Sequence, residues 1–88
     1  MRRRIIFKGR VQGVGFRWNT VDALKGYLIT GLVRNLSDGS VELIIEGKPE
    51  CLDEAQKRVE DRMRGYWKSR TYEDIDGEPH YDNFKILY

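Results

Sequence analysis

Cysteine and histidine are nearly absent from this sequence of 88 residues, which has one of each, Cys51 and His80. A lone thiol cannot form an internal disulfide or complete a zinc site, and it fits the reducing conditions of the cytoplasm. Cys51 has no histidine near it in the sequence, and His80 lies in a polar, turn-rich stretch. We therefore expect no thiol nucleophile, no catalytic histidine, and neither a metal ion nor another cofactor.

Long hydrophobic runs are also missing. No stretch approaches the roughly 20 apolar residues of a membrane-spanning helix, and the apolar run Ile5–Phe7 is too short for a signal peptide. The net charge is only +2, from 16 basic and 14 acidic residues, so charge gives no support to nucleic-acid or membrane binding. We interpret the basic run Arg2–Arg4 as a solvated N-terminus. We expect a cytoplasmic protein with neither of those partners.

No internal repeat, low-complexity tract or linker interrupts the sequence. Hydrophobic residues make up 40% of it, enough for one small core. The expectation is a single domain over residues 1–88. A monomer is the simplest assembly, because no hydrophobic stripe is left over once the core positions are assigned.

Hydrophobic periodicity and turn signals predict five strands and two helices. The Asp38-Gly39 pair predicts a hairpin turn, Pro49 suits the first turn of a helix, and Gly65 suits its end. The predicted strands span residues 3–8, 30–36, 40–46, 67–75 and 83–88, and the predicted helices span residues 16–28 and about 49–64. This order matches the ferredoxin-like split βαββαβ sandwich, plus a short C-terminal strand. That α+β fold packs two helices on one face of an antiparallel sheet.

A glycine-rich segment, Gly9–Arg17, joins the first strand to the first helix and reads GRVQGVGFR. Its glycines allow a tight turn and a close backbone approach to a ligand, and Arg17 follows at the start of the helix, where anions are favoured. This combination predicts a phosphate-binding loop. An ordinary strand-to-helix turn with a surface arginine remains the alternative. The Walker pattern is absent, and the dinucleotide pattern fails because Trp18 replaces its third glycine.

Two motifs at matching spacing give the sequence a strong resemblance to the acylphosphatase family. The loop motif is residues 9–17, the strand-turn-strand motif GLVRNLSDGSVE is residues 31–42, and an aromatic C-terminal strand covers residues 81–88. The resemblance implies hydrolysis of the carboxyl-phosphate bond of acyl phosphates, without a metal ion or a covalent phosphoenzyme. Inorganic phosphate is then the product and an inhibitor.

The resemblance also implies the roles of individual residues. Arg17 and the loop amides hold the phosphoryl group, while Asn35 positions the attacking water. The implied phosphate-binding loop comprises Gln12, Gly13, Val14, Gly15, Phe16 and Arg17. Without the resemblance, Asn35 is better explained as a turn-forming residue before Ser37-Asp38-Gly39.

The residue types suit this chemistry. An acyl phosphate releases a carboxylate, whose conjugate acid has a pKa near ~4, so no general acid is required. What remains is charge stabilisation and alignment of water. The planar guanidinium of Arg17 can bind two phosphate oxygens, and the amide of Asn35 can both donate and accept a hydrogen bond.

Three positions depart from the family pattern. Leu32 replaces a common tryptophan, with an expected effect on packing only. Asn19 replaces a common aromatic residue just after the loop, where we expect it to alter access to the pocket. Gly26 arrives two positions early and leaves Leu28 in place of a glycine, which puts the end of the first helix in doubt.

Two other functions deserve comparison. An RNA-binding ferredoxin-like domain needs solvent-facing aromatic residues on its inner strands, and none is present there. A non-catalytic regulatory or binding domain of the same family is the second alternative. Such domains open much longer carbamoyltransferases of hydrogenase maturation, and the presence of Arg17 and Asn35 argues against that interpretation.

Overall fold

Five strands and two helices follow one another in the predicted order in the computed structural model, which describes residues 1–88. The bounds of strand β4 coincide with the prediction, and those of β1, β2, β3 and β5 differ by one residue at one end or at both. The elements are β1 (Arg2–Gly9), α1 (Phe16–Ala23), β2 (Thr30–Asn35), β3 (Val41–Glu46), α2 (Pro49–Arg62), β4 (Trp67–Ile75) and β5 (Phe84–Leu87).

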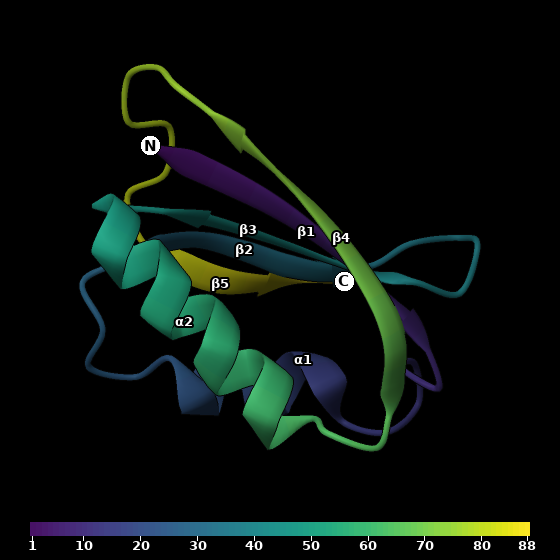
Figure 1. Ribbon diagram of the computed structural model, residues 1–88. Coiled ribbons are helices and arrows are strands. Elements are labelled where there is room, and N and C mark those ends of the chain that lie inside the picture. Colours follow the sequence, from purple (N-terminus) through teal and green to yellow (C-terminus); the bar gives the residue numbers. More distant parts are fainter.

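The strands form one sheet in the order β4-β1-β3-β2-β5. Strands β1 to β4 pair antiparallel, while β5 pairs parallel with β2, from Gly31 opposite Phe84 to Arg34 opposite Leu87. The C-terminal strand therefore makes the sheet mixed. Both helices lie on one face of the sheet (Figure 1). This arrangement confirms the predicted ferredoxin-like fold class, and it brings the end of β5 beside the start of α1.

The hydrophobic core lies between the sheet and the two helices. Strand alternation points Ile5, Phe7 and Val33 toward the helices, where each is completely buried. Leu52, Ala55 and Val59 recur at helical spacing and give α2 a fully buried face. The core therefore fixes β1 and β2, the two strands whose ends carry the predicted loop and Asn35.

Helix α1 is shorter than the sequence predicted. It ends at Ala23, and Leu24 supplies the last buried residue of its apolar face. Gly26 then adopts a φ of 85°, a left-handed conformation that ends a helix and suits glycine. The predicted extension to Leu28 is wrong: that side chain is 86% exposed. Leu32, by contrast, is buried in β2, at a packing position.

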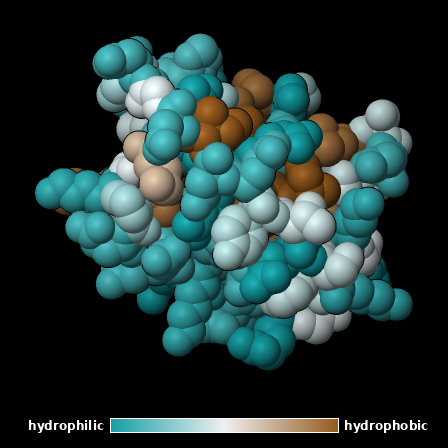
Figure 2. All heavy atoms as spheres, turned by 45° about the horizontal axis from the view of Figure 1, so that its top comes forward, coloured by the Kyte–Doolittle hydropathy of each residue, from teal (hydrophilic) through white to brown (hydrophobic).

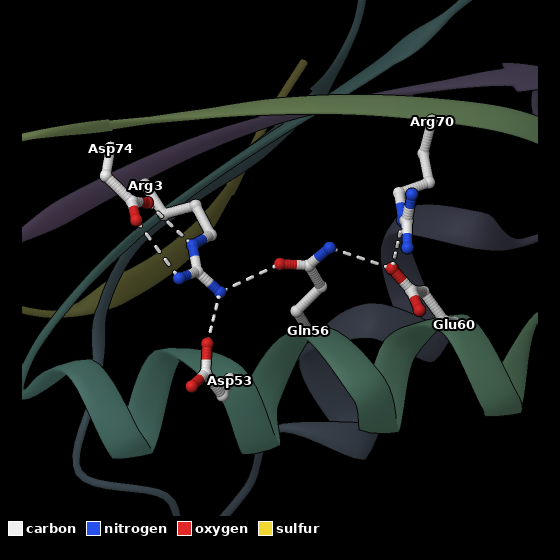
Figure 3. Close-up of polar contacts among 6 residues, drawn as sticks. All are labelled: Arg3, Asp53, Gln56, Glu60, Arg70 and Asp74. Carbon is white, nitrogen blue, oxygen red and sulfur yellow. Dashed lines mark hydrogen bonds and ion pairs between the residues drawn. The ribbon is translucent and has the colours of Figure 1, made fainter.

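The prediction of a solvated Arg2–Arg4 segment is also wrong, because these residues form the start of the inner strand β1. Arg3 is buried on the helix-facing side, where it donates hydrogen bonds to Asp74, Asp53 and Gln56 (Figure 3). Arg4 points to the opposite face and pairs with the buried carboxylate of Glu42. Flanking strands and α2 thus supply partners that the local sequence does not reveal.

The face of the sheet away from the helices is mostly hydrophilic. Figure 2 shows hydrophobic atoms there only as small groups separated by hydrophilic ones. The buried carboxylate of Glu42 accepts from Arg4 and from Arg34 on this face, which accounts for a charged residue in the middle strand. Neither helix has the length and apolar character that a membrane-crossing helix requires.

Candidate active site

The loop between β1 and α1 presents backbone N–H groups that the protein leaves unpaired. Gly13 and Gly15 have φ values of 76° and 78°, left-handed conformations that glycine adopts without strain. Between residues 12 and 18, no backbone N–H group donates to a protein acceptor. Left-handed residues within such a turn direct successive N–H groups into a concavity that favours anions. The positive end of α1, which begins at Phe16, adds to this preference.

Two side chains of the predicted loop hold it in place. Phe16 is 2% exposed, and its ring lies 5.1 Å from that of Phe7, measured between centroids. Gln12 donates from Nε2 to the carbonyl oxygens of Leu36 and Ser40, at 2.7 and 2.9 Å. The side chain of Gln12 thus ties the loop to the β2–β3 hairpin, a role that the sequence analysis did not assign.

Arg17 follows at the second position of α1 and has no acidic partner. None of the ion pairs in the structure involves it. Its Nη1 donates to the carbonyl oxygen of Leu87 at 3.4 Å, and its Cζ lies 4.8 Å from the centre of the Tyr88 ring. The guanidinium is therefore oriented by the end of the chain while its charge stays uncompensated by any carboxylate.

Asn35 is the last residue of β2, opposite Val41 of β3. Its side-chain amide makes no hydrogen bond within the protein, whereas the neighbouring turn is closed by Asp38. The Asp38 carboxylate accepts from the hydroxyl and the backbone N–H of Ser40, and these bonds lower the pKa of Asp38. The turn is thus stabilised without the Asn35 side chain, which leaves that amide available to a ligand or to water.

Arg17 and Asn35 meet at one cavity of about 150 Å³. Gln12 and Val14, which were predicted with the loop, do not line it, and Val14 instead packs against the core. Val11, Trp18, Ile86 and Tyr88 line the cavity without having been predicted as site residues, although the aromatic C-terminal strand was a signal for Tyr88. The lining residues are Val11, Gly13, Gly15, Phe16, Arg17, Trp18, Asn35, Ile86 and Tyr88.

The larger hollows and the other reactive side chains of the molecule do not combine loop amides with an unpaired cation. Larger hollows of about 490 and 600 Å³ lie between the helices and beside Leu28, but neither includes the loop amides or Arg17. Cys51 is half-buried on α2, and the backbone N–H of His80 donates to Glu46, away from the cavity. No group of three histidine, cysteine or acidic side chains is placed to hold a metal ion.

The sequence and the structure were both compared with known proteins. The family model described as acylphosphatase matches residues 3–86. An acylphosphatase from Trichormus variabilis is 48% identical over 54 residues, which cover 61% of this chain and 54% of that relative. An acylphosphatase from Lacticaseibacillus paracasei is 35% identical over 86 residues, which cover 96% of this chain and 92% of the relative.

The matched segment therefore spans about half the length of the first of these relatives and most of the second. Among solved structures, the acylphosphatase from Bacillus subtilis superimposes with a TM-score of 0.89 at 30% identity, over 99% of this chain and 98% of that one. This superposition agrees with the predicted fold. All three of these proteins are named acylphosphatases.

Proposed function

Since this chain belongs to the acylphosphatase family, we propose that it is an acylphosphatase, an enzyme that hydrolyses acyl phosphates to a carboxylate and inorganic phosphate. The proposal rests above all on one observation: Arg17, Asn35 and the loop glycines line the same small cavity. A cation without an acidic partner, unpaired amide donors and an unpaired carboxamide there suit a phosphoryl group and a nearby water.

Binding of the phosphoryl group is assigned to the loop and Arg17. The unpaired N–H groups between residues 12 and 18 would donate to the phosphoryl oxygens, and the guanidinium would bind two of them as a fork. Both kinds of donor are fixed before the substrate arrives, so they stabilise the charge of the transition state without reorganising. We propose that this reaction needs no metal ion and no cofactor.

Asn35 is assigned to the attacking water. Its amide oxygen can accept from water while its amide nitrogen donates to a phosphoryl oxygen, which aligns the nucleophile with the phosphorus atom. The leaving carboxylate needs no proton, so the absence of an acidic or histidine side chain from the cavity lining is compatible with the reaction. Attack by water directly on phosphorus involves no covalent phosphoenzyme.

The domain organisation, oligomeric state and location of the enzyme are also proposed. We propose that residues 1–88 act as one domain, as a monomer, because hydrophobic atoms on the open sheet face form only small groups (Figure 2). A cytoplasmic location suits the single free thiol, Cys51. Inorganic phosphate is proposed as product and competitive inhibitor, since it shares the phosphoryl group that the loop recognises.

Steady-state hydrolysis of benzoyl phosphate, with and without a chelator, tests the proposal. We expect turnover that is unchanged by the chelator and competitive inhibition by inorganic phosphate. A strict requirement for magnesium would overturn the metal-free mechanism, and non-competitive inhibition would argue against a shared phosphate site. No hydrolysis of benzoyl or acetyl phosphate would remove the proposed activity.

A further inference from the structure

Asn19, one of the departures from the family pattern, was expected to alter access to the pocket, and it is not among the residues that line the cavity. Its side chain turns back toward the loop, and its Nδ2 donates to the carbonyl oxygen of Gly15 at 2.8 Å. The same carbonyl accepts the backbone N–H of Asn19 at 2.9 Å. Two donors thus fix one carbonyl group in the wall of the proposed phosphate site.

This carbonyl controls the direction of a backbone donor. The peptide group between Gly15 and Phe16 is planar, so its carbonyl and its N–H point in opposite directions. Gly15 itself adopts a left-handed φ of 78°, and the N–H of Phe16 has no protein acceptor. Holding the Gly15 carbonyl therefore also aims the Phe16 N–H, one of the groups assigned to the phosphoryl oxygens.

Asn19 is in turn held by the other helix. Arg62, the last residue of α2, donates from Nε to Asn19 Oδ1 at 3.1 Å and from Nη2 to Asp22 Oδ2 at 2.7 Å. The hydrogen bond from Arg62 is the main reason that the pKa of Asp22 lies below its ordinary range, with a smaller contribution from Lys25. The arginine thus connects the end of α2 to two successive turns of α1.

We propose that Asn19 is a positioning residue for the phosphate loop and that Arg62 acts through it. The chain of contacts runs from Arg62 to Asn19 to the Gly15 carbonyl, and so to the Phe16 N–H. The inference rests on the proposed function of the loop. It also explains how a polar residue serves at a position where the family commonly has an aromatic one.

The measurement is the dissociation constant of inorganic phosphate, obtained by calorimetric titration and therefore independent of turnover. Arg62→Gln should weaken phosphate binding about three- to tenfold, the range for loss of one neutral or partly exposed hydrogen bond. Asn19→Ala should weaken it by a similar factor. The double variant should bind no more weakly than Asn19→Ala alone, because Arg62 then has no residue through which to act.

Arg64→Gln is the matched control. It removes the same charge two positions later, but Arg64 pairs with Asp61 in an exposed contact and bonds to no residue of α1. We expect less than a twofold change in phosphate binding. Equal effects of Arg62→Gln and Arg64→Gln would reduce the role of Arg62 to general charge and overturn the proposal.

Two further results separate the proposals from each other. If Arg62→Gln weakens phosphate binding as much in the Asn19→Ala background as in the wild type, Arg62 does not act through Asn19. That result would also overturn the proposal. If the wild-type protein binds phosphate with the expected pattern but hydrolyses no acyl phosphate, the positioning role stands and the proposed activity fails. Thermal unfolding of each variant identifies any loss of affinity that comes from incomplete folding.

Discussion

Arg3 donates two hydrogen bonds to Asp74, from Nε to Oδ1 at 2.7 Å and from Nη2 to Oδ2 at 3.2 Å (Figure 3). The guanidinium is buried, and its remaining nitrogen donates to Asp53 and Gln56 of α2 at 2.9 Å each. Arg3 thus joins the inner strand β1 to the edge strand β4 and to α2. The bond to Asp74 also raises the pKa of Arg3, so its charge persists despite burial.

Asp74→Asn should lower the free energy of unfolding at pH 7 by about 1–3 kcal/mol. The change leaves a buried guanidinium with one charged partner fewer, although Asp53 and the 35% exposure of the Asp74 side chain limit the loss. Urea denaturation of both proteins measures it. Glu73→Gln is the matched control, because Glu73 is 64% exposed and its carboxylate lies as far as 3.9 Å from the Arg4 guanidinium. We expect this control to lower the free energy of unfolding by less than about 0.5 kcal/mol.

The stability difference between wild type and Asp74→Asn should depend on pH in one direction. The hydrogen bond from Arg3 lowers the pKa of Asp74 in the folded state. A lowered pKa contributes stability above the pKa of the unfolded chain, and that contribution is lost as the pH falls through the folded value. The difference should therefore be constant from pH 7 to 5 and shrink below about pH 4. A difference that grows on acidification would contradict this assignment of charge.

Local patterns in the sequence were sufficient for the order of the elements, whereas the roles of Arg17 and Asn35 were implied by the family resemblance and stay predictions. Strand β4 has the predicted bounds, and it is flanked by Gly65 and Gly77, which both adopt positive φ. Arg17 and Asn35 line the same cavity because each stands at the end of an element that the core fixes. The cavity between them follows from that packing.

Contacts between distant segments were not predictable from local patterns. The burial of Arg3 depends on Asp74, which is far away in the sequence, and periodicity gave no sign of it. The parallel pairing of β5 and the contact of Tyr88 with Arg17 likewise depend on tertiary packing. The error at Leu28 has a different cause. Leu28 is apolar and lies at helical spacing, but the left-handed conformation of Gly26 ends the helix before it, and the Leu28 side chain is exposed.

Gln12→Ala should lower stability more than it lowers phosphate affinity. The substitution removes two hydrogen bonds, to the carbonyl oxygens of Leu36 and Ser40. Each carbonyl keeps one backbone donor, so the cost is that of the two lost bonds, about 1–3 kcal/mol together. Phosphate should still bind within a few-fold of wild type, because the Gln12 side chain does not line the cavity. Ser37→Ala, in the exposed turn nearby, serves as the control. Loss of phosphate binding without loss of stability would return Gln12 to the binding loop.

Arg17→Ala should lower turnover of benzoyl phosphate by on the order of a thousandfold, as for other arginines that stabilise phosphoryl transfer. Arg17→Lys should recover little, because an ammonium group cannot bind two phosphoryl oxygens as a fork. Both variants should keep a cooperative thermal transition, since the guanidinium has no carboxylate partner and its only hydrogen bond and cation–π contact are with Leu87 and Tyr88. A lysine variant with near wild-type turnover would show that Arg17 supplies only diffuse charge.

Asn35→Ala separates alignment of water from binding of phosphate. The side-chain amide has no partner within the protein, so its removal should leave the fold and the hairpin turn intact. Phosphate affinity should stay within a few-fold of wild type, because Arg17 and the loop amides remain. Turnover should fall by about a hundredfold or more, as for other single polar groups that act on the transition state.

Titration of phosphate and steady-state turnover on the same preparation provide the two numbers for Asn35→Ala. Asn83→Ala is the matched control: it makes the same substitution at an exposed asparagine that uses only its backbone carbonyl, toward Gly31. Equal losses of affinity and turnover in Asn35→Ala would make Asn35 a phosphate-binding residue. No loss of either would mean that Asn35 serves only to lead β2 into its turn. A loss of turnover alone would assign the amide to the reaction, because the phosphate contacts of Arg17 would then be unchanged.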